Sequence, residues 1–276
     1  VRGKPEKFAD HFSQATLFWN SQTPTERNHI VAAYRFELTR VQTPAIRARV
    51  VSLLRNVDEG LAQRVADGLG MDLPPAQQRA LEPPVRSEVD ASPALSLFAH
   101  PGDGGVAGRR VAILVADGVD AGRLRVLYDA LAAAGAAPRF LGVKLGRLKA
   151  VGGEAIEVEA TLETMPSPMW DAVAIPGGGP ADAALAGVGA AVEFVKEQYR
   201  HCKTLGVLGA PAASTLLAAA GVPTADAEVE ADPGIVAMAS GDGGPSTSAL
   251  DGAAQAFVVA LGRHKHFERE RDPAPV

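Results

Sequence analysis

The sequence predicts an α/β protein with a small all-helical unit, a proline-rich linker and then a doubly wound parallel sheet covered by helices. Two observations predict this class. Helix-start motifs and apolar residues at helical spacing fill residues 23–73, and short apolar runs alternate with helical patterns from residue 95 onward. The composition is that of a globular protein, since 47% of the 276 residues are hydrophobic and 21% are charged.

Charge and cysteine content exclude several classes of protein. A formal net charge of −5 argues against nucleic acid or an anionic membrane as a partner, because both attract dense Lys and Arg patches. No apolar run approaches the roughly 18 residues of a membrane span, and no signal peptide opens the chain. Cys202 is the only cysteine, which excludes an intrachain disulfide framework and favours a cytoplasmic location. Because the chain begins at Val1 rather than Met, we expect a segment of a longer protein.

The first domain is expected to be helical behind an extended arm. Residues 1–22 carry several aromatic residues without a clean period and are predicted to be extended. The sequence Thr-Pro-Thr-Glu at residues 23–26 is a capping box with proline at the first helical position. Residues 43–44 repeat the start signal, and Asp58 begins a third helix that ends near Gly68. The apolar residues expected to face the core of the first two helices are Ile30, Tyr34, Leu38, Val41, Ile46, Val50, Leu53, Leu54 and Val57.

A proline-rich segment at residues 74–94 separates this helical domain from the rest of the chain. Proline removes backbone donors and blocks helix formation, so we expect an extended linker there. Residues 95–276 are rich in Ala, Gly and Val and alternate between strand and helix patterns, which indicates right-handed crossovers. The predicted strands are 111–115, 139–143, 156–158 (half exposed), 171–175, 203–208 and 235–238.

The turn after the predicted strand 203–208 is the most informative place for chemistry, because open α/β sheets carry their sites at the carboxyl ends of strands. A nucleophile elbow would place Ser or Cys there. The turn instead begins with Gly209 and Ala210 and contains no nucleophile, base or acid. The glycine run Gly177–Gly179 lacks the spacing of nucleotide-binding loops and is interpreted as a tight turn.

Other candidate residues are better explained by structure than by catalysis. Ser214 is expected one turn into a helix without a nearby His, and Cys202 next to His201 is a sequence neighbour pair rather than a catalytic one. His264 and His266 are expected on a solvated face of a charged tail rather than in a metal site. The carboxylates Asp117 and Asp120 could hold a cation or position a base, but are favoured as turn formers or helix caps.

Sequence motifs resemble those of one known family. The stretch from Gln14 to Met71 resembles the helical domain of large-subunit haem catalases. The sequence from residue 95 onward resembles the flavodoxin-like domain that those catalases append, which is related to PfpI-type, class I amidotransferase-like proteins. The motifs are Leu17–Asn20, Thr23–Glu26, His29–Leu38 and Ile46–Val50 in the first part, and Ser96–Phe98, Val111–Leu114 and Asp171–Gly178 in the second.

The resemblance implies which functional residues are missing. The family's haem pocket uses a distal His and Asn and a proximal Tyr in an R-x-F-x-Y motif, whereas Tyr34, Tyr128 and Tyr199 all lie outside such a motif. PfpI-type relatives use an elbow Cys, a following His and a Glu after the first strand. Gly209 and Ala210 occupy the elbow here, and Gly122 or Arg123 stands near the position of the Glu. The resemblance therefore implies no catalytic, cofactor-binding or metal-binding residue in this segment.

We therefore expect the C-terminal part of a large-subunit catalase without its haem-binding core, whose parent reaction converts hydrogen peroxide to water and oxygen. Its implied roles are to stabilise the homotetramer and to shape the channel to the haem, with the rest of the catalase chain and its tetramer mates as partners. An independent binding or holdase-like module that uses the aromatic arm and the helical apolar face is the alternative. A PfpI-type hydrolase or glyoxalase is disfavoured by the missing elbow Cys.

Overall fold

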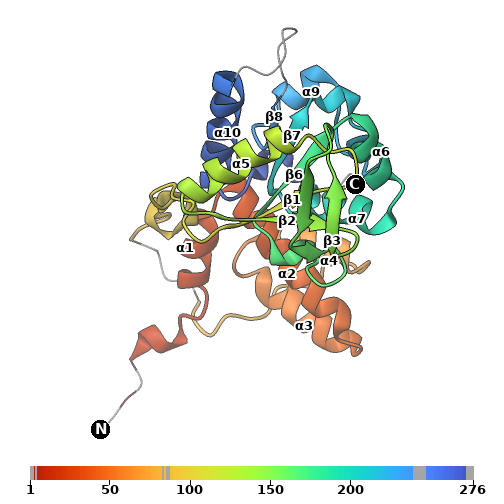
Figure 1. Cartoon of the computed structure of the whole chain (residues 1–276). Helices are drawn as coiled ribbons and strands as arrows, with labels where there is room; N and C mark the ends of the chain where they lie inside the picture. Colours follow the sequence, from red (N-terminus) through yellow and green to blue (C-terminus); the bar gives the residue numbers. More distant parts are fainter. Residues whose placement is uncertain (1–2, 4, 83, 85–87, 239–246, 272–276) are drawn as a thin grey trace. The chain divides into compact units, whose positions relative to one another are not determined.

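The computed structural model describes residues 3, 5–82, 84, 88–238 and 247–271. It divides the chain into two compact units, Val1–Pro101 and Gly102–Val276, which we call unit 1 and unit 2. Unit 1 is helical, and unit 2 holds a six-stranded sheet with helices against it (Figure 1). The α/β class predicted from the sequence is confirmed.

Helices and a long irregular segment make up unit 1. In the part of the chain that the structure describes, its elements are η1 (Glu6–Ala9), α1 (Ser13–Ser21), α2 (Pro24–Arg40), α3 (Pro44–Leu54), α4 (Glu59–Gly68), η2 (Pro93–Leu95) and η3 (Leu97–Ala99). The prediction of an extended arm was wrong for residues 13–21, which form α1. Trp19 of that helix is only 5% exposed and packs in the core of unit 1 with Val31 and Leu38. Burial of this aromatic side chain stabilises a helix that has no clear apolar period of its own.

The predicted helix starts are confirmed, while the predicted core faces are confirmed only in part. Thr23 and Glu26 form the capping box of α2, and Asp58 caps α4 by accepting from the amide of Leu61. Tyr34 is 36% exposed and Ile46 is 43% exposed, so their expected places in the core were wrong. The residues of unit 1 that are buried in the core are Trp19, Val31, Leu38, Val51, Leu54, Leu61, Ala62, Val65 and Ala66.

Glu26 connects the start of α2 to a segment 70 residues further along the chain. Its carboxylate accepts four hydrogen bonds: from Thr23 N at 2.8 Å, from Thr23 Oγ1 at 2.9 Å, from Ser96 Oγ at 2.9 Å and from Leu97 N at 2.7 Å. Burial alone would raise the pKa of this carboxyl group, but the hydrogen bonds outweigh burial and hold the pKa below its ordinary value. The capping carboxylate thus also fastens η2 and η3 to the helices.

The described ends of the proline-rich segment are hydrogen-bonded to the helices. Ser52 Oγ donates to Pro75 O at 2.7 Å, Asn56 Nδ2 donates to Gln77 O at 2.8 Å, and Gln22 Nε2 donates to Leu95 O at 3.2 Å. The carbonyl groups of an extended segment with few helical or ladder partners are satisfied in this way by side chains. The boundary between the two compact units falls after Pro101, where the sequence suggested residue 94.

Replacing Glu26 by Gln is expected to lower the free energy of unfolding of the chain by about 1–3 kcal/mol, because an amide cannot accept all four hydrogen bonds of the carboxylate. In the wild type, the stabilising contribution of the Glu26 carboxylate should be complete above the ordinary pKa of Glu. It should be lost as the pH falls from that value through the lowered pKa of Glu26 in the folded state. Urea unfolding at neutral and acidic pH measures both effects. Glu37→Gln is the matched control, because the Glu37 side chain is 69% exposed. Equal losses in the two variants would contradict the role of Glu26.

A parallel six-stranded sheet forms the centre of unit 2. Its strands lie in the order β5-β2-β1-β6-β7-β8, and a separate antiparallel pair is formed by β3 and β4. The order reverses between β1 and β6, which confirms the doubly wound topology. The strands are β1 (Arg110–Leu114), β2 (Ala137–Gly142), β3 (Gly146–Lys149), β4 (Ala155–Val158), β5 (Ala160–Thr161), β6 (Ala172–Gly177), β7 (Thr204–Gly209) and β8 (Ile235–Ala237).

Helices cover both faces of this sheet, and each face has its own apolar core (Figure 1). α5 and α10 pack on one face through Leu124, Leu127 and Phe257, whereas α6, α7 and α8 pack on the other. The helices are α5 (Ala121–Ala133), α6 (Gly179–Ala186), α7 (Gly189–Arg200), α8 (Thr215–Ala219), α9 (Asp226–Glu230) and α10 (Thr247–Gly262). The short 3-10 helices are η4 (Ser167–Met169), η5 (Pro211–Ala213) and η6 (Phe267–Arg269).

Most elements of unit 2 follow the sequence prediction, and the differences concern short elements. β3, β5 and α9 were not predicted: β5 has only two residues, and β3 and α9 have no buried residue and carry no apolar run. The half-exposed strand at 156–158 is confirmed as β4, whose burial alternates, but it pairs with β3 outside the main sheet.

Candidate functional site

The turn after β7 lacks the two features of a nucleophile elbow, which are a reactive side chain and a strained backbone. β7 ends at Gly209, and Ala210 has φ −86° and ψ 126°, which is ordinary extended backbone. A nucleophile elbow is a strained turn that exposes a reactive side chain. Here η5 follows directly, and the next α-helix begins only at Thr215. The turn therefore offers neither a nucleophilic side chain nor a strained backbone to present one.

Backbone packs directly against backbone at this end of the sheet. Gly177 of β6 is the register partner of Gly209 of β7. A Cβ atom on Gly209 would lie 2.3 Å from the carbonyl oxygen of Gly177, so only glycine fits there. Gly178 and Gly179 have φ values of 101° and 78° and form the tight turn expected from the sequence.

Arg123 contacts the strand that leads into the elbow. Its Nη1 donates to the carbonyl oxygen of Leu208 at 3.3 Å, and its Nε lies 3.4 Å from Asp120 Oδ2. The sequence placed this residue near the position of a catalytic Glu in PfpI-type proteins. A guanidinium has no lone pair with which to take up a proton at neutral pH, so it cannot act as a general base there.

The two aspartates after β1 have the structural roles that the sequence favoured. Asp120 caps α5 by accepting from a backbone amide in its first turn at 3.1 Å. Asp117 accepts from the amide of Lys149 at 2.8 Å and so ties the turn after β1 to β3. Among the described residues, no group of three or more His, Cys, Asp and Glu side chains could hold a metal ion. In the same part of the chain, no helix is long and apolar enough to cross a membrane.

Ser214 was expected one turn into a helix, and that placement was wrong. It is the N-cap of α8, and its hydroxyl donates to Asp182 Oδ1 at 2.7 Å. Asp182 is fully buried and also accepts from the amide and hydroxyl of Thr215 at 2.6 and 2.7 Å. The Ser214 hydroxyl donates to a carboxylate that two further donors already engage, and it also caps α8, so its role is structural.

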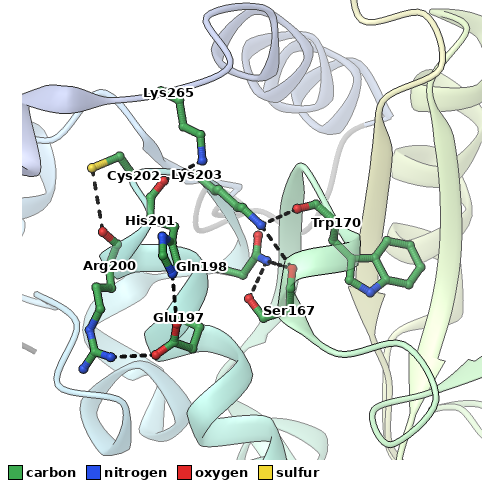
Figure 2. Close-up of polar contacts among 9 residues, drawn as sticks. All are labelled: Ser167, Trp170, Glu197, Gln198, Arg200, His201, Cys202, Lys203 and Lys265. Atoms are coloured by element: carbon green, nitrogen blue, oxygen red, sulfur yellow. Dashed lines mark hydrogen bonds and ion pairs between the residues drawn. The ribbon is translucent and has the colours of Figure 1, made fainter. Parts of the chain in front are cut away.

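The turn between α7 and β7 lies at the opposite end of β7 from the elbow. It contains His201 and Cys202, and the buried polar side chains of Gln198 and Lys203 lie beside them (Figure 2). Cys202 has a φ of 57° and is 4% exposed. His201 Nε2 lies 3.1 Å from Glu197 Oε2, while the Cys202 thiol faces the carbonyl oxygen of Arg200. Burial raises the pKa of the Cys202 thiol, which disfavours the reactive thiolate. The neighbours in sequence thus do not form a Cys–His pair.

Lys203 fastens this turn to the loop before β6. Its Nζ donates to the carbonyl oxygens of Ser167 at 3.1 Å and of Trp170 at 2.5 Å, and Figure 2 shows all three residues with Gln198. Gln198 is fully buried, and its amide donates to Ser167 O and Oγ, each at 2.8 Å. Burial lowers the pKa of the Lys203 ammonium to about 8. The amine is engaged by carbonyl acceptors, so the arrangement joins two loops rather than presenting a nucleophile.

The charged tail at residues 264–271, which we call the C-terminal strap, packs onto the same turn. The prediction that both of its histidines lie on a solvated helix face was wrong. His264 is exposed, but His266 is fully buried and its Nε2 lies 3.0 Å from Thr204 Oγ1. α10 ends at Gly262, so the strap is not helical at these positions and can turn one histidine inward.

A cavity of about 370 Å³ lies beside the strap in unit 2, lined in part by Tyr199, Glu228 and Arg271. Its most buried cation, Arg269, is already paired, because Arg269 Nε donates to Asp232 Oδ2 at 2.6 Å. The guanidinium also lies over the Tyr199 ring, 4.7 Å from its centroid. Arg269 is therefore engaged by groups of the chain itself.

Lys203, Asp182 and Arg269, which fasten separate chain segments together, were not among the residues predicted from the sequence. Lys203 has a readable signal, since it is the charged residue directly before the apolar run of β7. Asp182 and Arg269 have none, because their partners lie more than thirty residues away in the chain.

Comparison with known families identifies the chain. Residues 107–271 match the C-terminal domain found in long catalases, and residues 5–69 match the family described as catalase-related immune-responsive. The first match covers more than half of the 276 residues. The chain belongs to the long-catalase family.

Individual long-catalase relatives match over part of their length. Catalase HPII of Pseudomonas putida is 44% identical over 206 residues, which are 74% of this chain and 29% of that protein. Catalase HPII of Mycobacterium avium is 36% identical over 277 residues, covering 99% of this chain and 37% of the relative. Catalase C of Rhizobium meliloti is 39% identical over 222 residues, which are 80% of this chain and 31% of that protein. The long-catalase segment thus spans about a third of the length of these curated relatives.

Gly209→Ala is expected to lower the free energy of unfolding by roughly 2–3 kcal/mol, because the new methyl group would collide with the Gly177 carbonyl. Gly189→Ala is the matched control: Gly189 begins α7 with nothing within 4 Å of the position that a methyl group would take, so this change should be neutral or stabilising. Urea unfolding of both variants measures the difference. Equal stability of the two would mean that β6 and β7 can separate at this point.

Ala210→Cys is expected to yield an ordinary thiol and no hydrolase activity. The backbone at residue 210 is unstrained, Arg123 is engaged by the Leu208 carbonyl and by Asp120, and neither a His nor a Glu stands at the family's positions to take up the thiol proton. Its rate of alkylation by iodoacetamide, compared with a free-cysteine peptide across pH 5 to 9, tests this. The wild type, with buried Cys202, gives the background rate. A thiolate already populated near pH 5 would instead reveal a residual active site.

Proposed function

We propose that this chain is the C-terminal region of a large-subunit catalase and that it supports the parent enzyme without taking part in its chemistry. The parent reaction is the conversion of hydrogen peroxide to water and oxygen. The observation that carries the proposal is the match of residues 107–271 to the C-terminal domain of long catalases, together with an elbow reduced to Gly209 and Ala210. The proposed compartment is the cytoplasm.

The proposed roles are to stabilise the tetramer and to shape the access channel to the haem. The partners are then the remainder of the catalase chain and its tetramer mates. Two features support a structural role: buried polar clusters such as Lys203 with Ser167 join loops, and Glu26 fastens η2 and η3 to the helices of unit 1. Such clusters hold backbone segments in place and leave no group free to react.

The tyrosines of this chain do not fit the haem that the family implies. The catalase axial ligand is a Tyr, which binds iron as the phenolate and is favoured by a lowered pKa. Burial raises the pKa of Tyr128, and Glu159 adds to that shift. Burial and then Asp232 raise the pKa of Tyr199. Tyr34 lines a groove of about 680 Å³ in unit 1, but its exposure would leave an iron ligand open to water. We assign no haem site to this segment.

A chimera tests the proposal directly. Catalase HPII of Pseudomonas putida should lose heat resistance and tetramer stability when the region that corresponds to this chain is deleted. Replacing that region with this chain should restore both, while the peroxide turnover of the haem centre stays within about twofold at low temperature, because the segment contributes no reacting group. Sedimentation and residual activity after heating are the measurements. Stoichiometric haem uptake and peroxide turnover by the isolated chain would overturn the proposal.

A holdase-like binding module remains the second candidate, and one observation favours it. The exposed large apolar side chains described for the chain concentrate in unit 1, where they are Phe8, Phe18, Tyr34, Phe36, Ile46, Val89, Leu95, Leu97 and Phe98. Exposed apolar groups of this kind bind partly unfolded chains as well as fixed partners. In that case the isolated chain would suppress aggregation of an unrelated heated enzyme, and deletion from the catalase would leave its heat resistance unchanged.

A further inference from the structure

The C-terminal strap closes over the turn between α7 and β7 through three consecutive carbonyl groups. Lys265 Nζ donates to the carbonyl oxygen of His201 at 2.8 Å, and the amide of His266 donates to that of Cys202 at 2.7 Å. Arg269 Nη1 donates to the next carbonyl, that of Lys203. We propose that this strap is a latch that opens when His266 is protonated and that its opening uncovers Cys202.

The surroundings of His266 make it the trigger. Its Nε2 is paired with Thr204 Oγ1 at 3.0 Å, whereas its buried Nδ1 has no hydrogen-bond partner. A Cβ atom on Gly234 would come within 2.5 Å of the ring, so the ring packs directly against this backbone. The imidazolium form carries N–H donors at both nitrogens. Protonation would therefore bury a second donor without an acceptor, which costs free energy in the closed state.

The charged groups facing His266 add to this cost. Two cations, Arg269 of the strap and Arg263 at the end of α10, oppose protonation, and two carboxylates, Asp232 before β8 and Glu268 of the strap, favour it. Both carboxylates are already paired, Asp232 with Arg269 at 2.6 Å and Glu268 with Arg263. β7 contributes only the neutral hydroxyl of Thr204 to the ring.

The direction of the pH effect follows from the two states of the latch. Burial first, and then Arg269, lower the pKa of His266 from 6.5 to about 4 in the closed state, while an opened strap leaves the ring at its ordinary value. The open state therefore binds more protons between these two values, and acid favours it. Lowering the pH from about 7.5 to about 5 should shift the closed-to-open equilibrium about 30-fold toward the open state.

Cys202 supplies a reporter that is native to the protein. It is the only cysteine, and its thiol is buried. The charged groups that act on the thiol are Glu270, Arg269 and Lys265 of the strap, followed by Asp232. Release of the strap would free the Cys202 carbonyl from His266 and move these charged groups away from the thiol, and we expect it to admit a reagent.

The test measures the reaction of Cys202 with 4,4′-dithiodipyridine in the full chain, divided by the rate of glutathione at the same pH. This relative rate should rise about 30-fold in the wild type between about pH 7.5 and about pH 5. His266→Gln keeps a polar group for Thr204 but cannot be protonated, so its relative rate should not change with pH. His264→Asn is the matched control, because Asn tolerates the positive φ of 65° at that exposed position and should keep the wild-type response.

Several outcomes would overturn the latch. A constant relative rate in the wild type, or an unchanged pH response in His266→Gln, would do so. Reaction only when the amides of β6 also lose protection from hydrogen exchange would show global unfolding instead of local release. If His266→Gln does not fold, the wild-type His266 ring resonance decides: loss of strap amide protection that follows its titration supports the latch, and titration near pH 6.5 with constant protection overturns it.

Discussion

The close approach of Gly177 and Gly209 is the constraint on which the rest of unit 2 depends. These residues end β6 and β7 as register partners, and a methyl group on either would overlap the backbone of the other. At this register pair the two strands can approach as closely as they do only because neither residue carries a side chain. Doubly wound sheets carry their chemistry at this edge. Here the edge offers only the closely packed backbone of these two glycines and the methyl group of Ala210.

The buried polar groups around the α7–β7 turn gather at the other end of the strands. Lys203 and Arg269 donate to backbone carbonyl groups, and the His266 ring contacts the Thr204 hydroxyl. All of these contacts lie close to the turn that contains Cys202. Groups of this kind hold two chain segments in one arrangement, since breaking one contact leaves a buried polar atom unpaired. Unit 2 therefore has no nucleophile at its elbow but has a buried polar network at the opposite edge of the sheet. That network binds the C-terminal strap to the start of β7.

Unit 1 uses the same principle on a smaller scale. Glu26 is part of a local capping box, yet its second function is to bind Ser96 and Leu97, so the start of one helix also holds the end of the unit. The apolar core of unit 1 is small, which leaves residues such as Phe36 and Leu97 largely exposed. This combination of a fastened backbone and exposed apolar side chains suits a part of a larger assembly, as proposed for a long catalase.

The sequence by itself determined the features that depend on neighbours in the chain. The caps at Thr23, Asp58 and Asp120, the strand and helix alternation and the empty elbow all follow from residues within a few positions of one another. Tertiary structure decided the rest, namely the helix around Trp19, the exposure of Tyr34, the capping role of Ser214 and the burial of His266. The physical reason is distance along the chain. A cap is satisfied within one turn, whereas burial of His266 requires Thr204, which is 62 residues away and is brought close only when the sheet has formed.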